Sequence, residues 1–264
     1  MNQFVESRYV ESIKRLALGL EPLDAALGGR ITHPIQVIFP ERLLGLPRPT
    51  VDRHDSCLHV LLYQPGVKDK VSLRFFEQAR RFVPRQIQFP ILTVSAAEAL
   101  NYRNRVRRPV LFPGAAYDSV SLSSGIRGRV TRNGKDVRWV RVEARLTPGG
   151  TLIGRAQGDD RGEFFLILSP AASPAHDLTD PVKVQVELFG PPLDPQPGNP
   201  EIPSLDKFWD LPTEIAVALD PVHPDNDSVS AGTVLPAGYV SLATKSFDVP
   251  LGTVLSQTTT FVIP

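Results

Sequence analysis

The densest group of reactive side chains in the sequence lies at residues 53–59, which read Arg-His-Asp-Ser-Cys-Leu-His. A thiol nucleophile at Cys57 would need a histidine placed to deprotonate it. If this segment is a strand, Cys57 and His59 face the same side about 7 Å apart, and no oxyanion loop accompanies them. A zinc site through His54, Cys57 and His59 would lack a fourth ligand. We therefore expect Cys57 to be a small buried apolar side chain rather than a catalytic or metal-binding group.

A second oxygen-rich segment, residues 220–227, carries Asp220, Asp225, Asn226 and Asp227. It lacks the alternating carboxylates and the bidentate glutamate of a calcium loop, so an Asx-rich turn is the favoured interpretation, with calcium binding left open. The sequence contains no glycine-rich phosphate loop, His-Glu-x-x-His helix or nucleophile elbow. These observations predict a protein that is not an enzyme and holds no cofactor or metal.

Seven arginines fall within 29 residues of an almost neutral chain. They are Arg80, Arg81, Arg85, Arg103, Arg105, Arg107 and Arg108. A solvated face is the default expectation, and the alternative is a set of bidentate pairs with carboxylates across a protein interface. Nucleic acid is disfavoured, because the net charge is +1 and few aromatic residues are interspersed.

Composition limits the class of protein. A chain of 264 residues can form one or two domains, and its 29 basic residues nearly match its 28 acidic ones. The 26 prolines indicate short strands joined by stiff connections. No apolar run approaches the roughly 18–20 residues that span a bilayer, and no basic segment followed by an apolar core opens the chain. We expect a protein with no signal peptide and no membrane insertion, cytoplasmic or part of an assembled particle. The single cysteine excludes an intramolecular disulfide.

Residues 1–116 are expected to form a mixed, mostly β region with one short helix. Apolar residues from Tyr9 to Leu20 lean towards one face, which predicts a helix ended by Pro22, followed by a short helix over 23–27 that stops at a glycine pair. This helix packs on its own domain or serves as an arm on a neighbouring subunit. Strands are predicted at residues 34–39, 57–63, 71–76 and 109–114, with one or two helical turns at 96–102. Residues 80–91 are expected to be extended, confined to a sheet edge by Pro84 and Pro90.

The most regular stretch, residues 124–189, alternates at the period of a β-strand. Asn133-Gly134 predicts a hairpin, since type I′ turns need positive φ at both central positions. Further strands are expected at 137–146, 151–156, 164–168 and 182–188, with a turn at 159–162.

This pattern resembles the carboxypeptidase regulatory-like domain. The residues that carry the resemblance are Gly128, Val130, Asn133, Gly134, Val137, Val140, Val142, Ala144, Asp159 or Asp160, Gly162 and Phe164. The resemblance covers about a quarter of the chain and implies an immunoglobulin- or transthyretin-like β-sandwich over residues 117–190. Such modules are non-catalytic appendages of many kinds of protein, so the fold says little about function.

Residues 191–264 are expected to form a proline-rich, extended arm with terminal strands at 215–219, 239–249 and 257–263. The arm is too short to fold alone, so it must add to the sandwich or to a neighbouring subunit. Phe208 and Trp209 are expected either to dock on the sandwich or to contact a partner.

Two hypotheses from different classes follow. The chain is weakly similar to accessory structural proteins of a phage tail or contractile injection particle. Together with the mixed, mostly β N-terminal part, the embedded sandwich, the proline-stiffened arm and the absence of a recognisable active site, this favours a cap, collar or baseplate component that acts through protein interfaces with other subunits, in a symmetric oligomer. The alternative is a soluble carbohydrate- or protein-binding module that presents Trp139 or Trp209 to a ligand.

Overall fold

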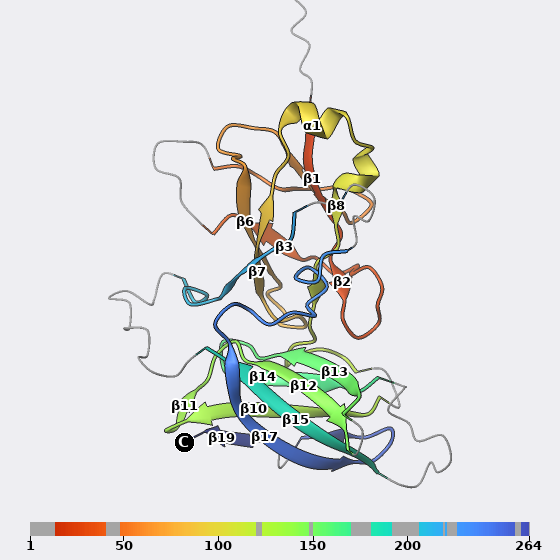
Figure 1. Ribbon diagram of the computed structural model, residues 1–264, viewed down its shortest axis with the longest axis vertical. Helices are drawn as coiled ribbons and strands as arrows, with labels where there is room; N and C mark the ends of the chain where they lie inside the picture. The colour runs from red at the N-terminus through yellow and green to blue at the C-terminus, as the bar shows by residue number, and fades with distance from the viewer. Residues whose placement is uncertain are drawn as a thin grey trace, which may run out of the picture.

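The computed structural model describes residues 14–40, 48–119, 123–147, 150–169, 181–191, 206–218, 220, 226–256 and 260–263. Within these residues the chain is mainly β, as predicted, with five sheets and a single α-helix. Figure 1 shows two stacked parts, one built by the strands up to β9 together with β16, and the other by the remaining strands from β10 onward. Among the described residues, no helix is long and apolar enough to cross a membrane.

The N-terminal part contains three small sheets and the only described helices. One sheet has the order β4 (Asp52–Arg53), β5 (His59–Leu62), β1 (Leu16–Leu20) and β8 (Val106–Arg107). A second has the order β16 (Thr213–Ile215), β7 (Arg85–Pro90), β6 (Lys70–Phe76) and β3 (Gln36–Ile38), and a third pairs β2 (Leu23–Asp24) with β9 (Val110–Leu111). The helices are α1 (Val94–Glu98) and the 3-10 turn η1 (Tyr102–Arg105). Their common core is aromatic and aliphatic, with Leu73, Phe75 and Phe89 fully buried.

The predicted N-terminal helix is wrong over the residues that the structure describes. Residues 16–20 form strand β1, which lies between β5 and β8 and is therefore covered along both edges. Leu23 and Asp24 form β2, and the following turn reaches Gly28 at a φ of 69°. A central strand that is buried on both faces has no polar alternation, so its leucines resemble the apolar stripe of a helix. Residues 1–13, including Tyr9, lie outside the described residues.

The edge position predicted for residues 80–91 is also wrong. Strand β7 is an interior strand that pairs antiparallel with β6 and parallel with β16. Pro84 precedes the strand and Pro90 is its last residue, so neither removes a donor from the middle of the ladder. The pairing strand β16 comes from more than 120 residues further along the chain, which no local pattern indicates.

The second part consists of two sheets that share one apolar core. Strand β10 (Gly125–Arg132) pairs with β14 (Glu163–Ile167) and β11 (Lys135–Asp136) on one side, and in parallel with β18 (Val254–Leu255) and β19 (Thr260–Ile263) on the other. The other sheet has the order β13 (Leu152–Gln157), β12 (Arg141–Leu146), β15 (Val182–Gly190) and β17 (Val240–Val249). Val130, Val142 and Phe164 all lie in the shared core.

The turn predictions in this part are confirmed. Asn133 and Gly134 have φ angles of 49° and 75° and connect β10 to β11. Gly128 lies opposite Phe164 in the β10–β14 ladder. Asp159 accepts from the backbone N–H of Arg161 at 2.8 Å, and Gly162 follows at a φ of 69°. Asp160 instead forms an ion pair with Arg80 of the N-terminal part, with its Oδ1 3.0 Å from Arg80 Nη1.

Gly162 and Gly134 provide a matched test of these turns. A Cβ at Gly162 would lie 2.6 Å from the carbonyl oxygen of Val130, whereas a Cβ at Gly134 would meet nothing within 4 Å. Both residues have positive φ. Gly162→Ala is expected to lower the free energy of unfolding by about 2–3 kcal/mol, and Gly134→Ala by about 1 kcal/mol. Urea unfolding of the two variants measures the difference, and equal losses would contradict the close approach at Gly162.

The C-terminal residues join the two parts. Strand β16 extends the N-terminal sheet, while β17, β18 and β19 extend the two sheets of the second part. The segment thus adds strands to the second part, where the sandwich was expected, and it adds one to the N-terminal part as well. The boundaries at 116/117 and 190/191 stay a prediction.

Candidate functional site

The reactive side chains at residues 53–59 are not arranged for catalysis. The strand predicted from Cys57 begins only at His59, and Cys57 lies in the β4–β5 turn at a φ of 62°, so the two side chains do not share a strand face. Cys57 is partly exposed rather than buried, and its Sγ accepts a hydrogen bond from Arg53 Nη2 at 3.6 Å. His54 Nδ1 lies 2.8 Å from Ser56 Oγ. The described residues contain no group of three or more His, Cys, Asp or Glu that could hold a metal ion.

His59 predicts a pH dependence of stability. Burial, with a smaller contribution from the charge of Arg53, lowers the pKa of His59 to about 4. The unfolded chain takes up this proton below about pH 6.5, so between these values only the unfolded state binds it. The contribution of His59 to stability is therefore full above about pH 6.5, and it falls by about 3 kcal/mol as the pH drops to 4.

Denaturant unfolding between pH 7 and pH 4 measures this loss. His59→Leu should remove this part of the slope, whereas His54→Leu, at an exposed histidine, should retain it. An unchanged slope in His59→Leu would contradict the assignment.

The oxygen-rich segment contributes a buried turn. Asp227 is 2% exposed, and its Oδ1 accepts from the backbone N–H groups of Val229 and Ser230 at 3.1 and 3.2 Å. Its Oδ2 accepts from Ser230 Oγ at 2.6 Å and faces Arg107 Nη1 at 3.3 Å. These contacts occupy the Asp227 carboxylate, as expected of an Asx turn. Residues 221–225 lie outside the described residues.

The arginine run is not one solvated face. Arg85 is fully buried and Arg107 is 2% exposed, so the default expectation is wrong for these two. Pairing with carboxylates does occur, but within the chain. The pairs are Arg80 with Asp159 and Asp160, Arg81 with Glu77, Arg85 with Glu214, Arg107 with Asp227, and Arg108 with Glu21. Arg105 donates to the carbonyl of Leu16 at 2.6 Å, and Arg103 is exposed beside Tyr102. A role in contacts with other subunits stays a prediction for the exposed members.

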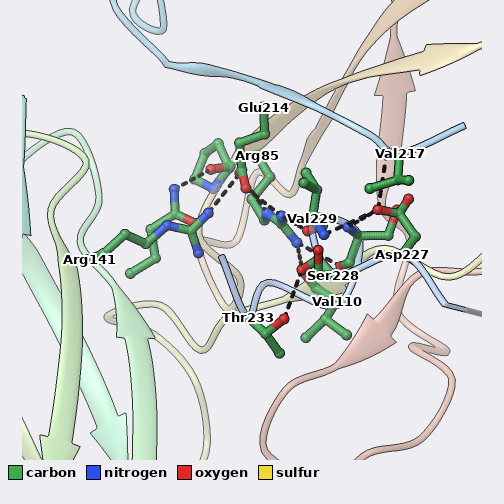
Figure 2. Close-up of polar contacts among 12 residues, drawn as sticks. Arg85, Val110, Arg141, Glu214, Val217, Asp227, Ser228, Val229 and Thr233 are labelled. Atoms are coloured by element: carbon green, nitrogen blue, oxygen red, sulfur yellow. Dashed lines mark hydrogen bonds and ion pairs between the residues drawn. The ribbon is translucent and has the colours of Figure 1, made fainter. Parts of the chain in front are cut away.

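The central feature is a buried charged junction between the two parts (Figure 2). Arg85 on β7 donates to Glu214 on β16 through two bonds, Nε to Oε1 at 2.9 Å and Nη2 to Oε2 at 2.7 Å. Arg141 on β12 approaches the same carboxylate from the second part, with Nη2 2.7 Å from Oε1. Arg85 also donates to the carbonyls of Val229 and Ser230 at 2.7 and 3.1 Å. Three distant segments therefore meet at one carboxylate.

The electrostatics keep Glu214 and Arg141 charged at neutral pH. Burial by itself would raise the pKa of Glu214, but the charges of Arg85 and Arg141 and their hydrogen bonds hold it below its usual range. Burial lowers the pKa of Arg141 to about 10, against the opposing charge of Glu214. Neither group titrates near pH 7, so the junction can fix position but cannot exchange protons there.

An aromatic contact reinforces the junction. Phe208 is 6% exposed and packs on Trp139 and Phe76, with ring centroids 6.0 and 5.6 Å apart. Trp139 Nε1 donates to Asp210 at 2.8 Å. Phe208 thus packs against both parts of the chain, on Trp139 of the second part and on Phe76 and Val83 of the N-terminal part. Trp139 is 2% exposed, so its proposed presentation to a ligand is wrong. Trp209 remains half-buried beside Arg138.

The sequence interpretation missed Glu214, Arg141 and Asp210. A signal was present for Glu214, which is the only charged residue between Leu211 and Leu219, whereas Arg141 is one of several charged residues that alternate with apolar ones between Arg138 and Arg145. Such a residue must either face water or find a partner of opposite charge. The partners lie 129 and 73 residues apart in sequence, so the pairing itself was not visible.

Comparisons with known proteins identify no family. No family model matches the chain, and no curated protein matches it. Among solved structures, a leucine-rich repeat protein from Bacteroides thetaiotaomicron VPI-5482 is 8% identical with a TM-score of 0.22. The match covers 94% of this chain and 26% of that chain. A TM-score of this size carries no argument about fold or function.

Proposed function

We propose that this chain is a non-enzymatic structural subunit of a phage tail or phage-tail-like contractile injection particle, such as a cap, collar or baseplate component. The observation that carries the proposal is the junction of Arg85, Glu214 and Arg141. Buried charged groups in an enzyme commonly take part in catalysis. In this junction they instead connect the two parts of the chain to each other. A rigid block of this kind suits a protein whose work is to hold its neighbours in position.

The second part, within this proposal, is a transthyretin-like β-sandwich of the carboxypeptidase regulatory-like type. Two sheets with one shared core support this assignment. The module serves as the platform, and the C-terminal strands β17 and β19 extend both of its sheets. In this view the sandwich contributes shape and stability rather than an active site.

Surfaces for other subunits remain on both parts. Strand β17 ends the order of its sheet and spans ten residues, most of them exposed. Arg103 is exposed, and Trp209 is half-buried beside Arg138. An aromatic residue next to arginines is the composition that protein interfaces favour.

Native mass spectrometry tests the proposal, with the purified chain alone and with the products of its neighbouring genes. We expect a complex well above the 29.0 kDa of one chain, and we expect Trp209→Ala to weaken it. Arg129→Ala serves as a control, because this arginine is occupied by Asp136 on an exposed hairpin. A stable monomer with every neighbour would overturn the proposal, and a monomer that binds glycans through Trp209 would favour the binding-module alternative.

A further inference from the structure

The hairpin between β10 and β11 carries a chemically reactive pair of residues, Asn133 and Gly134. Asparagine is followed by glycine at this one place in the sequence. Glycine has no Cβ, so its backbone nitrogen is less shielded from the preceding side chain than that of any other residue. Figure 1 shows the hairpin at the left-hand end of the second part, and both residues are exposed to solvent.

Neither of the two reacting groups is held by a hydrogen bond. The described residues offer no hydrogen-bond partner to the side-chain amide of Asn133 or to the backbone N–H of Gly134. The pairing of Arg132 with Lys135 closes the turn and leaves both residues outside the ladder. A Cβ at Gly134 would meet nothing within 4 Å, so no neighbouring group packs on this nitrogen or blocks a small movement of the turn.

Asn101 shows the contrasting situation within the same chain. It is also exposed, but its Oδ1 accepts from the backbone N–H of Arg103 at 3.0 Å. The residue that follows it is Tyr102, whose side chain crowds the backbone nitrogen. An asparagine that is exposed to the same degree is therefore held in place at position 101 and not at position 133.

We propose that Asn133 is a site of spontaneous deamidation in the folded protein. The backbone nitrogen of Gly134 loses its proton and attacks Cγ of Asn133. A new N–Cγ bond closes a succinimide ring, the Cγ–Nδ2 bond breaks, and Nδ2 takes up protons and leaves as ammonia. Water then opens the ring at one of its two carbonyl groups. Opening at Cγ gives aspartate, and opening at the main-chain carbonyl gives isoaspartate. This site is independent of the proposed function.

The two products affect the hairpin differently. Each adds one negative charge, which takes the net charge from +1 to 0. Aspartate leaves the length of the backbone unchanged, so the register of β10 and β11 can persist. Isoaspartate adds its Cβ to the main chain of a two-residue turn, which then no longer has the type I′ geometry that matches the two strands. Strand β11 pairs only through Lys135 and Asp136, so we expect the isoaspartate form to lose this pairing.

Prolonged incubation of the full chain, followed by peptide mass spectrometry, tests the site. We expect an acid to accumulate at position 133, partly as isoaspartate, while Asn101 keeps its amide. The rate should rise from pH 6 to pH 8, because the attacking nitrogen must lose its proton. Ion exchange separates the aged forms by charge. The isoaspartate form should unfold at a lower temperature than Asn133→Asp, which carries the added charge without the longer backbone.

A matched pair of glycine variants locates the reaction. Gly134→Ala should slow it by about tenfold or more, because a Cβ crowds the attacking nitrogen. Gly238→Ala is the control, since Gly238 also has a positive φ, at 80°, and open space around its Cβ position, but it follows an alanine. It should leave the rate unchanged. The proposal is overturned if position 133 stays an amide in the folded chain, if it reacts only in urea, or if Asn101 reacts equally fast. An unchanged rate in Gly134→Ala would overturn it as well.

Discussion

Replacing Glu214 by glutamine should lower the free energy of unfolding by about 3–5 kcal/mol, the usual cost of leaving a buried charge without its partner. Arg85 is 0% exposed and Arg141 is 4% exposed, and Glu214 is the carboxylate that both of them bind. The amide keeps the shape of the side chain and can still accept a hydrogen bond. It removes only the negative charge that compensates two buried guanidinium groups. Guanidinium chloride unfolding followed by tryptophan fluorescence measures the loss.

The matched control is Glu98→Gln. Glu98 pairs with Arg15 at 2.9 Å, but both side chains are about half exposed, at 55% and 47%. Solvent screens such a pair, so its loss should cost less than about 1 kcal/mol. A loss below 1 kcal/mol in Glu214→Gln would show that the junction does not hold the two parts together, and it would remove the main support for the structural-subunit proposal.

Local signals explain which parts of the fold were predictable. The turns at Asn133-Gly134 and at Asp159–Gly162 depend on the φ preferences of a few adjacent residues, and both occur where expected. The strands predicted at 151–156, 164–168 and 182–188 were located to within about two residues. The strand predicted at 137–146 begins only at Arg141, because residues 137–140 form a turn. Strand β1 was missed, because its leucines are buried on both faces and carry no alternation.

The charged junction depends on contacts that are distant in sequence. Residues Arg85, Ile87 and Phe89 are all buried on one face of β7, so the two-residue period did place Arg85 with the core residues. Only the position of β16 shows which carboxylate compensates it. Solvated arginines and interface arginines produce the same sequence pattern as buried ones. Density of arginine therefore indicated carboxylate partners without indicating that those partners lie in the same chain.

Phe208→Ala is expected to lower the free energy of unfolding by about 3–5 kcal/mol, as large-to-small substitutions of buried aromatic residues do. The ring is 6% exposed and packs in one cluster with Val83 and Trp139. Arg74 lies over the same ring at 5.5 Å and binds Asp206 at 2.8 Å, so the cavity would also loosen an ion pair. The measurement is again chemical denaturation, with near-ultraviolet circular dichroism of Trp139 as a local readout.

Trp209→Ala provides the control, since it removes the adjacent and larger aromatic ring. Trp209 is only half-buried and contacts Arg138 at 5.9 Å, so its loss should cost about 1 kcal/mol or less. If the C-terminal segment docks through Phe208 alone, Phe208→Ala must lower the free energy of unfolding by more than Trp209→Ala does. Equal losses would mean that both rings are buried together, which would leave Trp209 unable to contact a partner and would contradict its assignment as an interface residue. A small loss in both variants would instead show that the segment around residue 208 detaches from Trp139 without unfolding either part.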